Sequence, residues 1–381
     1  IRRKNKGLDM RNNKKFYYKY IHLMYGHDTK FSKLLLDFIS NPENGFEINQ
    51  HLFVTPYKNV FDDLKQYSNV LLDESNKNLY KVYYKHCHLI ISHSGEELYR
   101  ILLTPKKIKN KVVYRYWGGM RILQYDENSK TFGESLKLKV KKYILKKSFS
   151  EFAAIGIANI TDIIDLSRIL KKDTKYYRLS YASNEYYDTV NKLKQKLDIE
   201  NDINKRYKKR VLLGHRGTEE NNHIEILKRL SKYNSENFDI FIPLSYGEKK
   251  YIQNVENYVK ENSKGNIVII KQFMKFSEYA EFLSTIDIAI FDGYTSYALG
   301  NLGIILFFNK TVYLNENGVI AKALESENND YKKISDIGKI SFEEFSKPMK
   351  YPANYTSDLC IISTEERIKN WNKLLADFSD K

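Results

Sequence analysis

Short apolar runs alternate with amphipathic ones along the whole chain. In the first half the apolar runs predict strands at 18–26, 51–55, 87–95, 111–119, 152–159 and 176–181. In the second half they predict strands at 210–214, 238–244, 266–271, 286–292 and 310–315. Between them, apolar residues at helical spacing predict helices at 30–39, 96–103, 222–233, 248–262, 277–285 and 300–308. Alternation of this kind is typical of parallel sheets covered by helices on both faces.

A polar segment, Lys192–Lys209, separates the two series and marks a domain boundary. We therefore expect an α/β protein with two Rossmann-like domains that face each other across a cleft. The predicted divisions are an acceptor domain at 1–195, a donor domain at 205–365, and a C-terminal helix at 366–381 that packs back on the first domain. Right-handed crossovers bring the carboxyl ends of the strands to one edge of each sheet, where ligands bind.

The strand–helix junction at Gly214 is the first candidate binding site. Glycine allows a sharp turn and a close approach by a ligand, and the free N–H groups at a helix start suit a phosphate. Arg216 and His223 are placed to pair with such a phosphate. The alternative is that Asn221 or Asn222 only caps the helix.

A second junction of the same kind follows the strand that ends at Asp292. Gly300 and Asn301 open an apolar helix there, so its backbone donors face the same edge of the sheet. Two helix starts on one edge predict a diphosphate clamp. The alternative for Gly300 and Gly303 is close packing of the helix on the sheet.

Several polar residues follow the strands of the first half. Possible proton-transfer groups are His27, Asp28, His93 and Glu96. A single histidine or aspartate in a loop is more often only solvated, and that alternative stays open for each. Gly26, His93 and Trp117 are our candidates for the acceptor side.

Composition limits the partners. There are 63 Lys and Arg against 47 Asp and Glu, a formal charge of +16, which favours an anionic partner. The 135–149 segment is basic and apolar by turns, which suits an anionic membrane surface, although a solvated helix face is the alternative. The predicted membrane patch is Lys137, Lys139, Lys141, Lys142, Lys146 and Lys147. No apolar window is long enough for a membrane span, no leader is visible, and no nucleic-acid motif occurs, so we expect a cytoplasmic protein at the inner face of the plasma membrane.

The sequence also resembles a known family. The segments LLGHRGTEENNHIEILKRL, FIPLSYGEKKYIQNVENYVKE, MKFSEYAEFLSTIDIAIF and LGNLGIILFFNKTVYLN are similar to the bacterial lipid-linked Fuc4NAc transferases, the 4-alpha-L-fucosyltransferase-like glycosyltransferases. YIHLMYGHD, HSG and YRYWGGM follow the family's order in the first half. The resemblance spans Tyr20–Asn315.

The resemblance implies a GT-B glycosyltransferase that moves a deoxyamino sugar from a dTDP-sugar to a polyprenyl-diphosphate-linked glycan. It implies no cofactor and no metal, and charge on the leaving diphosphate would be stabilised by cations and helix starts. The donor-binding residues we predict are Gly214, His215, Arg216, Asn222, His223, Tyr246, Glu278, Asp292, Gly300 and Asn301. Tyr246 would contact base or ribose, and Glu278 would accept from a ribose hydroxyl unless it only caps its helix.

Catalytic roles fall to Arg216 and, where a base is needed, to His27 or Asp28. If the enzyme retains the anomeric configuration, as the family suggests, no strong base is required. The loops His215–Thr218 and Asp292–Tyr297 depart from the family pattern near the expected sugar. A UDP- or GDP-sugar and another glycan or protein acceptor are therefore the alternative. A basic nucleic-acid-binding protein is the less favoured reading.

Overall fold

The computed structural model describes residues 18–24, 29–73, 87–93, 102, 104–117, 132–167, 169–170, 173–181, 184–200, 207–352, 355 and 357–379. The chain forms two compact units, each of which makes most of its contacts within itself. One comprises Ile1–Arg115, Glu151–Ile155 and Asn372–Lys381, and the other comprises Tyr116–Ser150 and Gly156–Trp371. Gly26, His27 and Asp28 lie outside the described residues.

The first half of the chain contributes a seven-stranded sheet in the order β3-β2-β1-β4-β5-β6-β7. The pairs from β3 to β5 are parallel. The strands are β1 (Tyr20–Leu23), β2 (His51–Thr55), β3 (Val70–Leu72), β4 (Leu89–Ser92), β5 (Val112–Arg115), β6 (Ala154–Ile157) and β7 (Tyr176–Arg178).

The helices of this half follow the strands in sequence. They are α1 (Thr29–Ser40), α2 (Lys58–Leu64), α5 (Lys106–Lys109), α7 (Phe132–Phe149), α8 (Ile160–Leu166) and α9 (Asn184–Glu200), with 3₁₀ turns at Pro42–Asn44 and Ile48–Gln50. α9 occupies the first part of the polar segment in which the sequence placed its boundary. One side of this long helix is solvated, which accounts for the polar residues in that part of the segment.

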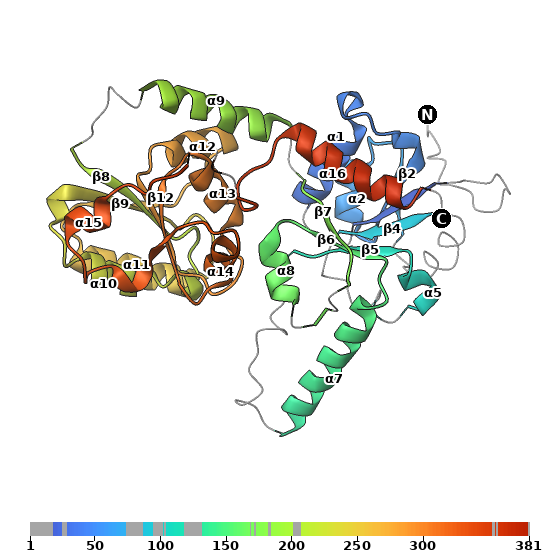
Figure 1. Cartoon of the computed structure of the whole chain (residues 1–381), viewed down its shortest axis with the longest axis horizontal. Coiled ribbons are helices and arrows are strands. Elements are labelled where there is room, and N and C mark those ends of the chain that lie inside the picture. The colour runs from blue at the N-terminus through green and yellow to red at the C-terminus, as the bar shows by residue number, and fades with distance from the viewer. Residues whose placement is uncertain are drawn as a thin grey trace, which may run out of the picture. The chain divides into compact units, whose positions relative to one another are not determined.

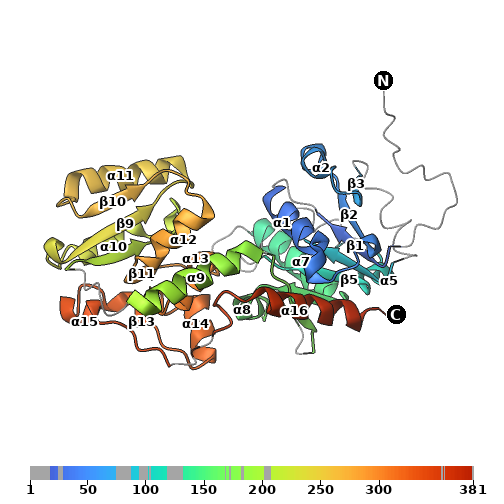
Figure 2. The same cartoon turned by 90° about the horizontal axis from the view of Figure 1, so that it is seen from above.

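The second half forms a six-stranded parallel sheet in the order β10-β9-β8-β11-β12-β13. The strands are β8 (Lys209–Leu213), β9 (Phe238–Pro243), β10 (Ile267–Ile270), β11 (Ile288–Phe291), β12 (Thr311–Leu314) and β13 (Lys332–Lys333). This is the doubly wound order, in which the chain starts at the centre and adds strands first on one side and then on the other. Figure 2 shows α11 beside β9 and β10 at one end of this sheet and α14 and α15 toward the other.

The remaining helices follow the strands of this sheet in sequence. They are α10 (His223–Leu230), α11 (Lys249–Asn262), α12 (Phe276–Ser284), α13 (Leu299–Phe307), α14 (Val319–Ser326), α15 (Phe342–Ser346) and α16 (Thr364–Asp377), with 3₁₀ turns at Glu219–Asn221, Ser235–Asn237 and Ile334–Asp336. The hydroxyl of Tyr20 donates to the carbonyl of Leu375 in α16, 3.4 Å away.

Strand residues alternate between two apolar cores, one on each face of the second sheet. Val211, Leu213 and Ile290 pack with α10 and α11. Leu212 and Ala289 pack on the other face with α9, α12, α13 and α14 (Figure 1). Because both faces are covered, these strands are continuous apolar runs, which is why the sequence pattern located them.

Candidate functional site

The site lies at the carboxyl edge of the second sheet, between β8 and β11. The chain continues from β8 to β9 on one side of this point and from β11 to β12 on the other. Open sheets of this type bind ligands at that switch point. Gly214 follows β8 with a φ of +69°, and its N–H donates to the carbonyl of Ile290 at 3.0 Å. A Cβ built on Gly214 would lie 2.5 Å from Nε2 of His223. Glycine is therefore required both by the backbone conformation and by the imidazole that packs against it.

Asn221 holds the loop that follows Gly214. Its Oδ1 accepts from the backbone N–H of His215 at 3.2 Å and from Nδ1 of the same histidine at 2.9 Å. Its Nδ2 donates to Oγ1 of Thr218 at 3.0 Å. Asn221 is buried and its side chain caps no helix, so it organises the loop and does not act as a ligand.

His223 is the first residue of α10 and is completely buried. The hydroxyl of Tyr251 on α11 lies 3.1 Å from the backbone nitrogen of His223 and 3.2 Å from Nδ1. Nε2 is buried and has no hydrogen-bond partner among the described residues. Burial lowers the pKa of His223 to about 3, so the ring is neutral near pH 7 and offers an N–H and not a charge.

Arg216 is the cation of the loop. Its Nε donates to Oγ1 of Thr218 at 3.2 Å, and Nη2 forms an ion pair with Glu220. Its guanidinium lies 4.9 Å from the centre of the Tyr297 ring. The side chain is partly exposed, so an anion can reach it in competition with Glu220.

The carboxylate of Asp292 lies between the side-chain amides of Asn222 and Asn315, and it links the start of α10 to the ends of β11 and β12. Asn222, at φ +49°, donates from Nδ2 to Oδ2 of Asp292 at 2.9 Å. Asn315, after β12, donates to Oδ1 of Asp292 at 2.7 Å. Asn222 makes no side-chain cap bond to α10, so the alternative in which it merely caps the helix does not hold. The N-cap residue of α10 therefore supplies no side-chain bond, and the first N–H of the helix, that of His223, donates instead to the hydroxyl of Tyr251.

The start of α13 lies in the same half of the chain and also lacks a side-chain cap. Its N-cap residue is Ala298, at φ +61°. Among the described residues outside its own helix turn, no atom lies within 4 Å of a Cβ built on Gly300, whereas one on Gly303 would lie 2.8 Å from the carbonyl of Leu359. Close packing therefore explains Gly303 but not Gly300. Asn301 donates from Nδ2 to the hydroxyl of Tyr279 at 2.8 Å.

Tyr246 and Glu278 complete the predicted donor set. Tyr246 follows β9 and is half exposed, and its carbonyl accepts from the N–H of Gly217 at 2.9 Å. Glu278 accepts from the N–H of Lys275, the N-cap residue of α12, at 3.1 Å, as the glutamate of a capping box does. The structure thus shows for Glu278 the capping role that was its predicted alternative.

Three buried histidines lie in the first sheet. His93, after β4, has Nε2 2.9 Å from Nδ1 of His22, and Nε2 of His22 lies 2.8 Å from Nδ1 of His51. Burial lowers the pKa of His93 to about 3 and that of His51 to about 4. Sequence reasoning named only His93. Trp117 is 40% exposed and meets Tyr181 edge-on, with ring centroids 5.3 Å apart.

The predicted membrane patch lies on α7. Lys139, Lys146 and Lys147 are exposed. Leu145 and Phe149 are buried, whereas Val140 is half exposed. The side chains of Lys137 and Lys141 lie outside the described part of the structure.

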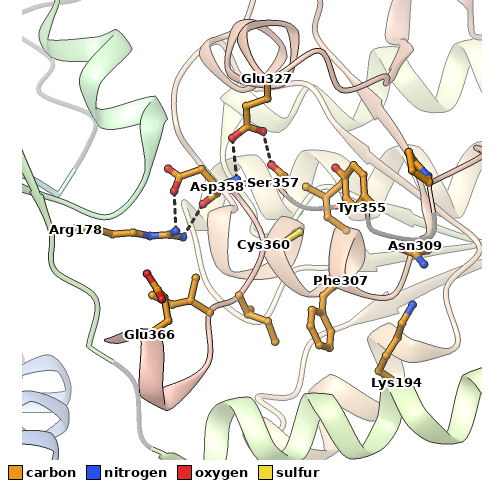
Figure 3. A pocket seen from close by; sticks show the side chains of 14 residues that line it. Arg178, Lys194, Phe307, Asn309, Glu327, Tyr355, Ser357, Asp358, Cys360 and Glu366 are labelled. Carbon is orange, nitrogen blue, oxygen red and sulfur yellow. Dashed lines mark hydrogen bonds and ion pairs between the residues drawn. The ribbon is translucent and has the colours of Figure 1, made fainter. Parts of the chain in front are cut away.

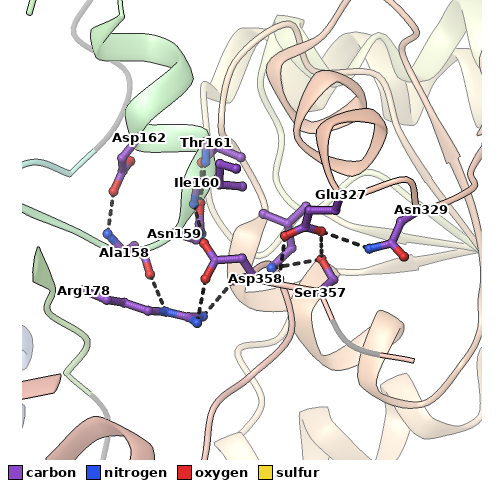
Figure 4. Close-up of polar contacts among 11 residues, drawn as sticks. Ala158, Asn159, Ile160, Thr161, Asp162, Arg178, Glu327, Asn329, Ser357 and Asp358 are labelled. Atoms are coloured by element: carbon purple, nitrogen blue, oxygen red, sulfur yellow. Dashed lines mark hydrogen bonds and ion pairs between the residues drawn. The ribbon is translucent and has the colours of Figure 1, made fainter. Parts of the chain in front are cut away.

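A cavity of about 710 Å³, away from the predicted site residues, was not predicted from the sequence (Figure 3). Its charged side chains already have partners. Arg178 pairs with Asp358 at 2.7 Å, and Lys194 lies 3.7 Å from Asp198. Glu327 accepts from the hydroxyl of Ser357 at 2.6 Å and from the N–H of Asp358 at 2.8 Å (Figure 4). This network joins β7, the end of α14 and the segment before α16, so the charges named here do not require an ionic ligand.

Within the described ranges, no group of three His, Cys, Asp or Glu side chains is arranged to hold a metal ion. Over the same residues, none of the helices combines the length and apolar character needed to cross a bilayer.

The two parallel α/β sheets and the ligand edge of the second define a GT-B glycosyltransferase fold. Alr3699/HepE from Anabaena in complex with UDP is similar, with a TM-score of 0.60 and 12% identity over 94% of this chain and 100% of that one. A glycosyltransferase from Rickettsia africae has a TM-score of 0.54 and 11% identity, over 95% and 94% of the two chains. A trehalose 6-phosphate synthase from Burkholderia multivorans has a TM-score of 0.57 and 9% identity, over 95% and 96%.

Residues 94–331 match the model of the 4-alpha-L-fucosyltransferase family, glycosyl transferase group 56. The chain belongs to this family. No curated protein sequence matches it. The predicted fold, the enzyme class and the family resemblance are thus confirmed.

Proposed function

We propose that this glycosyltransferase binds a nucleoside diphosphate sugar between the Gly214 loop and the start of α13. Its donor is a dTDP-activated deoxyamino sugar, and its acceptor is a polyprenyl-diphosphate-linked glycan at the cytoplasmic face of the membrane. The resemblance to the lipid-linked Fuc4NAc transferases supports the sugar and acceptor classes. The family match supports a fucosyltransferase, and the described residues around Gly214 support the place of the diphosphate.

The observation that carries the proposal is the start of α10. A partly exposed arginine, a buried imidazole nitrogen without a partner and a helix start without a side-chain cap lie next to Gly214. A buried N–H that bonds to nothing costs roughly 1–3 kcal/mol, which a phosphate oxygen would recover. Helix starts and arginine side chains are both suited to phosphate.

The chemistry follows from where charge develops. As the anomeric C–O bond breaks, negative charge grows on the departing diphosphate, and Arg216 with the two helix starts would stabilise it. Asn222 and Asp292 fix the edge beside it, and Tyr246 offers an exposed ring to base or ribose. We assign the acceptor side to Gly26, His93 and Trp117, with His27 or Asp28 as the base if inversion requires one.

A UDP- or GDP-sugar donor is the second candidate. The Anabaena protein of similar fold was crystallised with UDP. The loops at 215–218 and 292–297 carry Arg216, Asp292 and Tyr297, which are also the residues nearest the expected sugar, so these loops would decide between donors.

Calorimetric titration with dTDP, UDP, GDP and poly(A) tests these alternatives. We expect one nucleoside diphosphate to bind and poly(A) not to compete. Arg216→Ala should weaken binding by about 1.5–3 kcal/mol, the range for hydrogen bonds to charged groups. Arg229→Ala is the matched control, because Arg229 also pairs with a glutamate four residues away, at 3.2 Å, but at the other end of α10. Equal losses in the two variants, or binding of poly(A) alone, would refute the proposal.

A further inference from the structure

Two neutral histidines flank Gly214, and each has a fixed partner on Nδ1. Burial lowers the pKa of His215 to about 4 and that of His223 to about 3, so neither is charged near pH 7. The chemistry each can offer therefore depends on which ring nitrogen carries its single proton.

Tyr251 decides the tautomer of His223. The backbone N–H of His223 can only donate, so it uses one lone pair of the tyrosine hydroxyl. Nδ1 is the acceptor that this hydroxyl then has within reach among the described residues, at 3.2 Å. When this hydroxyl donates to Nδ1, the ring proton of His223 sits on Nε2, the buried nitrogen that faces Gly214.

Asn221 decides the tautomer of His215 in the opposite sense. Its Nδ2 donates to Thr218, so Oδ1 is the atom that meets His215. A carbonyl oxygen only accepts, so Nδ1 of His215 carries the proton and Nε2 holds a lone pair.

From these contacts we propose that His223 and His215 act as a complementary donor and acceptor pair, positioned by Tyr251 and Asn221. This inference rests on the function proposed above. His223 donates from Nε2 to a phosphate oxygen, and His215 accepts at Nε2 from a hydroxyl of the nucleotide or its sugar. The pair would therefore recognise a diphosphate joined to a hydroxyl-bearing group, by two neutral hydrogen bonds in addition to the charge of Arg216.

The tautomers are measured directly by ¹⁵N NMR of the histidine side chains in the full chain without ligand. We expect His223 in the Nε2–H form and His215 in the Nδ1–H form, both unchanged between pH 6 and 8. Tyr251→Phe should convert His223 to a mixture of tautomers and leave His215 as it was. Tyr258→Phe, the same change two turns further along α11, should alter neither. The same tautomer in both histidines would overturn the proposal.

Binding separates the two roles. Tyr251→Phe should weaken pyrophosphate, UDP and UDP-glucose alike, in proportion to the share of His223 that leaves the Nε2–H form, about twofold for an equal mixture. His215→Leu should leave pyrophosphate binding unchanged and weaken the ligands that carry hydroxyls. Loss confined to UDP-glucose would identify the hydroxyl as that of the donated sugar, and loss with UDP as well would identify the ribose.

Failure of this inference is distinguishable from failure of the proposed function. If the wild type binds nucleoside diphosphates but Tyr251→Phe binds them equally well, only the positioning role is wrong. If the wild type binds none of the three ligands, both proposals about the ligand fail, whatever tautomers the free protein shows.

Discussion

At the scale of single residues, Gly214 carries two requirements at once. It is in the left-handed region, and it leaves room for Nε2 of His223. Gly265 shares the first requirement but not the second, since its φ is +86° and no atom lies within 4 Å of a Cβ built there.

Gly214→Ala should therefore cost more than Gly265→Ala. The left-handed conformation alone costs an L-residue about 1–2 kcal/mol. At Gly214 the displaced imidazole adds to that cost and weakens nucleoside diphosphate binding. Urea unfolding and titration of both variants check this. Equal stability losses, with binding intact in both, would show that the imidazole contact is unimportant.

Asp292 allows a second prediction at this scale. Both of its oxygens already accept from amides, and Arg216 and the helix starts supply positive potential. We expect nucleoside diphosphate binding, and transfer once donor and acceptor are found, to survive EDTA. Asp292→Asn should weaken binding to the same extent with and without the chelator.

The opposite result would have a clear form. EDTA would abolish turnover, Mg²⁺ or Mn²⁺ would restore it, and Asp292→Asn would mimic the chelator. Charge stabilisation by Arg216 and the helix starts would then be the wrong assignment.

At the scale of elements, three adjacent strands, β2, β1 and β4, share the buried histidine chain. Burial lowers the pKa of His51 in the folded protein to about 4 and that of His93 to about 3. As the pH falls below about 6.5, the ordinary pKa of histidine, these side chains take up protons in the unfolded chain before they do so in the folded protein. Stability is fully present above that pH and is lost as the pH falls toward the folded-state values, by roughly 2 kcal/mol per histidine between pH 6.5 and 5.

Unfolding free energies measured at pH 7 and pH 5 test this for the wild type and His51→Gln. The variant should lose less stability on acidification, because one fewer buried imidazole must take up a proton. An identical pH dependence in the two proteins would contradict the prediction.

The element scale also shows what the sequence could and could not predict. The long apolar runs of β8, β9 and β11 were visible because both of their faces are buried. β3 and β13 were missed, since the first is only half-buried and the second has two residues.

Among the site residues, Gly214 and Asp292 were predicted because each follows a buried strand. Tyr251 and Asn315 were not predicted, because they reach the site across 28 and 23 residues of intervening chain. His22 and His51 escaped for the same reason, since nothing in the sequence signals a contact between neighbouring strands at that separation.

At the scale of the whole molecule, a formal charge of +16 favours an anionic surface irrespective of any patch. A local patch on α7 makes a sharper claim. If Lys139, Lys146 and Lys147 are all changed to Glu, binding to anionic vesicles should fall by about two orders of magnitude, at roughly 1 kcal/mol for each lysine near the surface. Sedimentation with vesicles at increasing salt measures it.

The control is the same charge reversal on α11, at the exposed Lys249, Lys250 and Lys260. Both variants change the net charge equally. If the two variants lose binding equally, anionic vesicles attract the protein through its net charge and not through α7. If the wild type does not bind anionic vesicles, or binds regardless of salt, peripheral electrostatic association is wrong.

The contacts of Asp292 with Asn222 and Asn315 bear on how this enzyme can diversify. Replacing any one of the three leaves a donor or an acceptor of the others without its partner, at a cost of about 1–3 kcal/mol if the orphan is buried. Replacing them together removes the orphan. The loops after β8, β11 and β12 are therefore expected to exchange as one inherited block, and grafting a single loop from a relative with another donor should yield a less stable protein before it yields a new specificity.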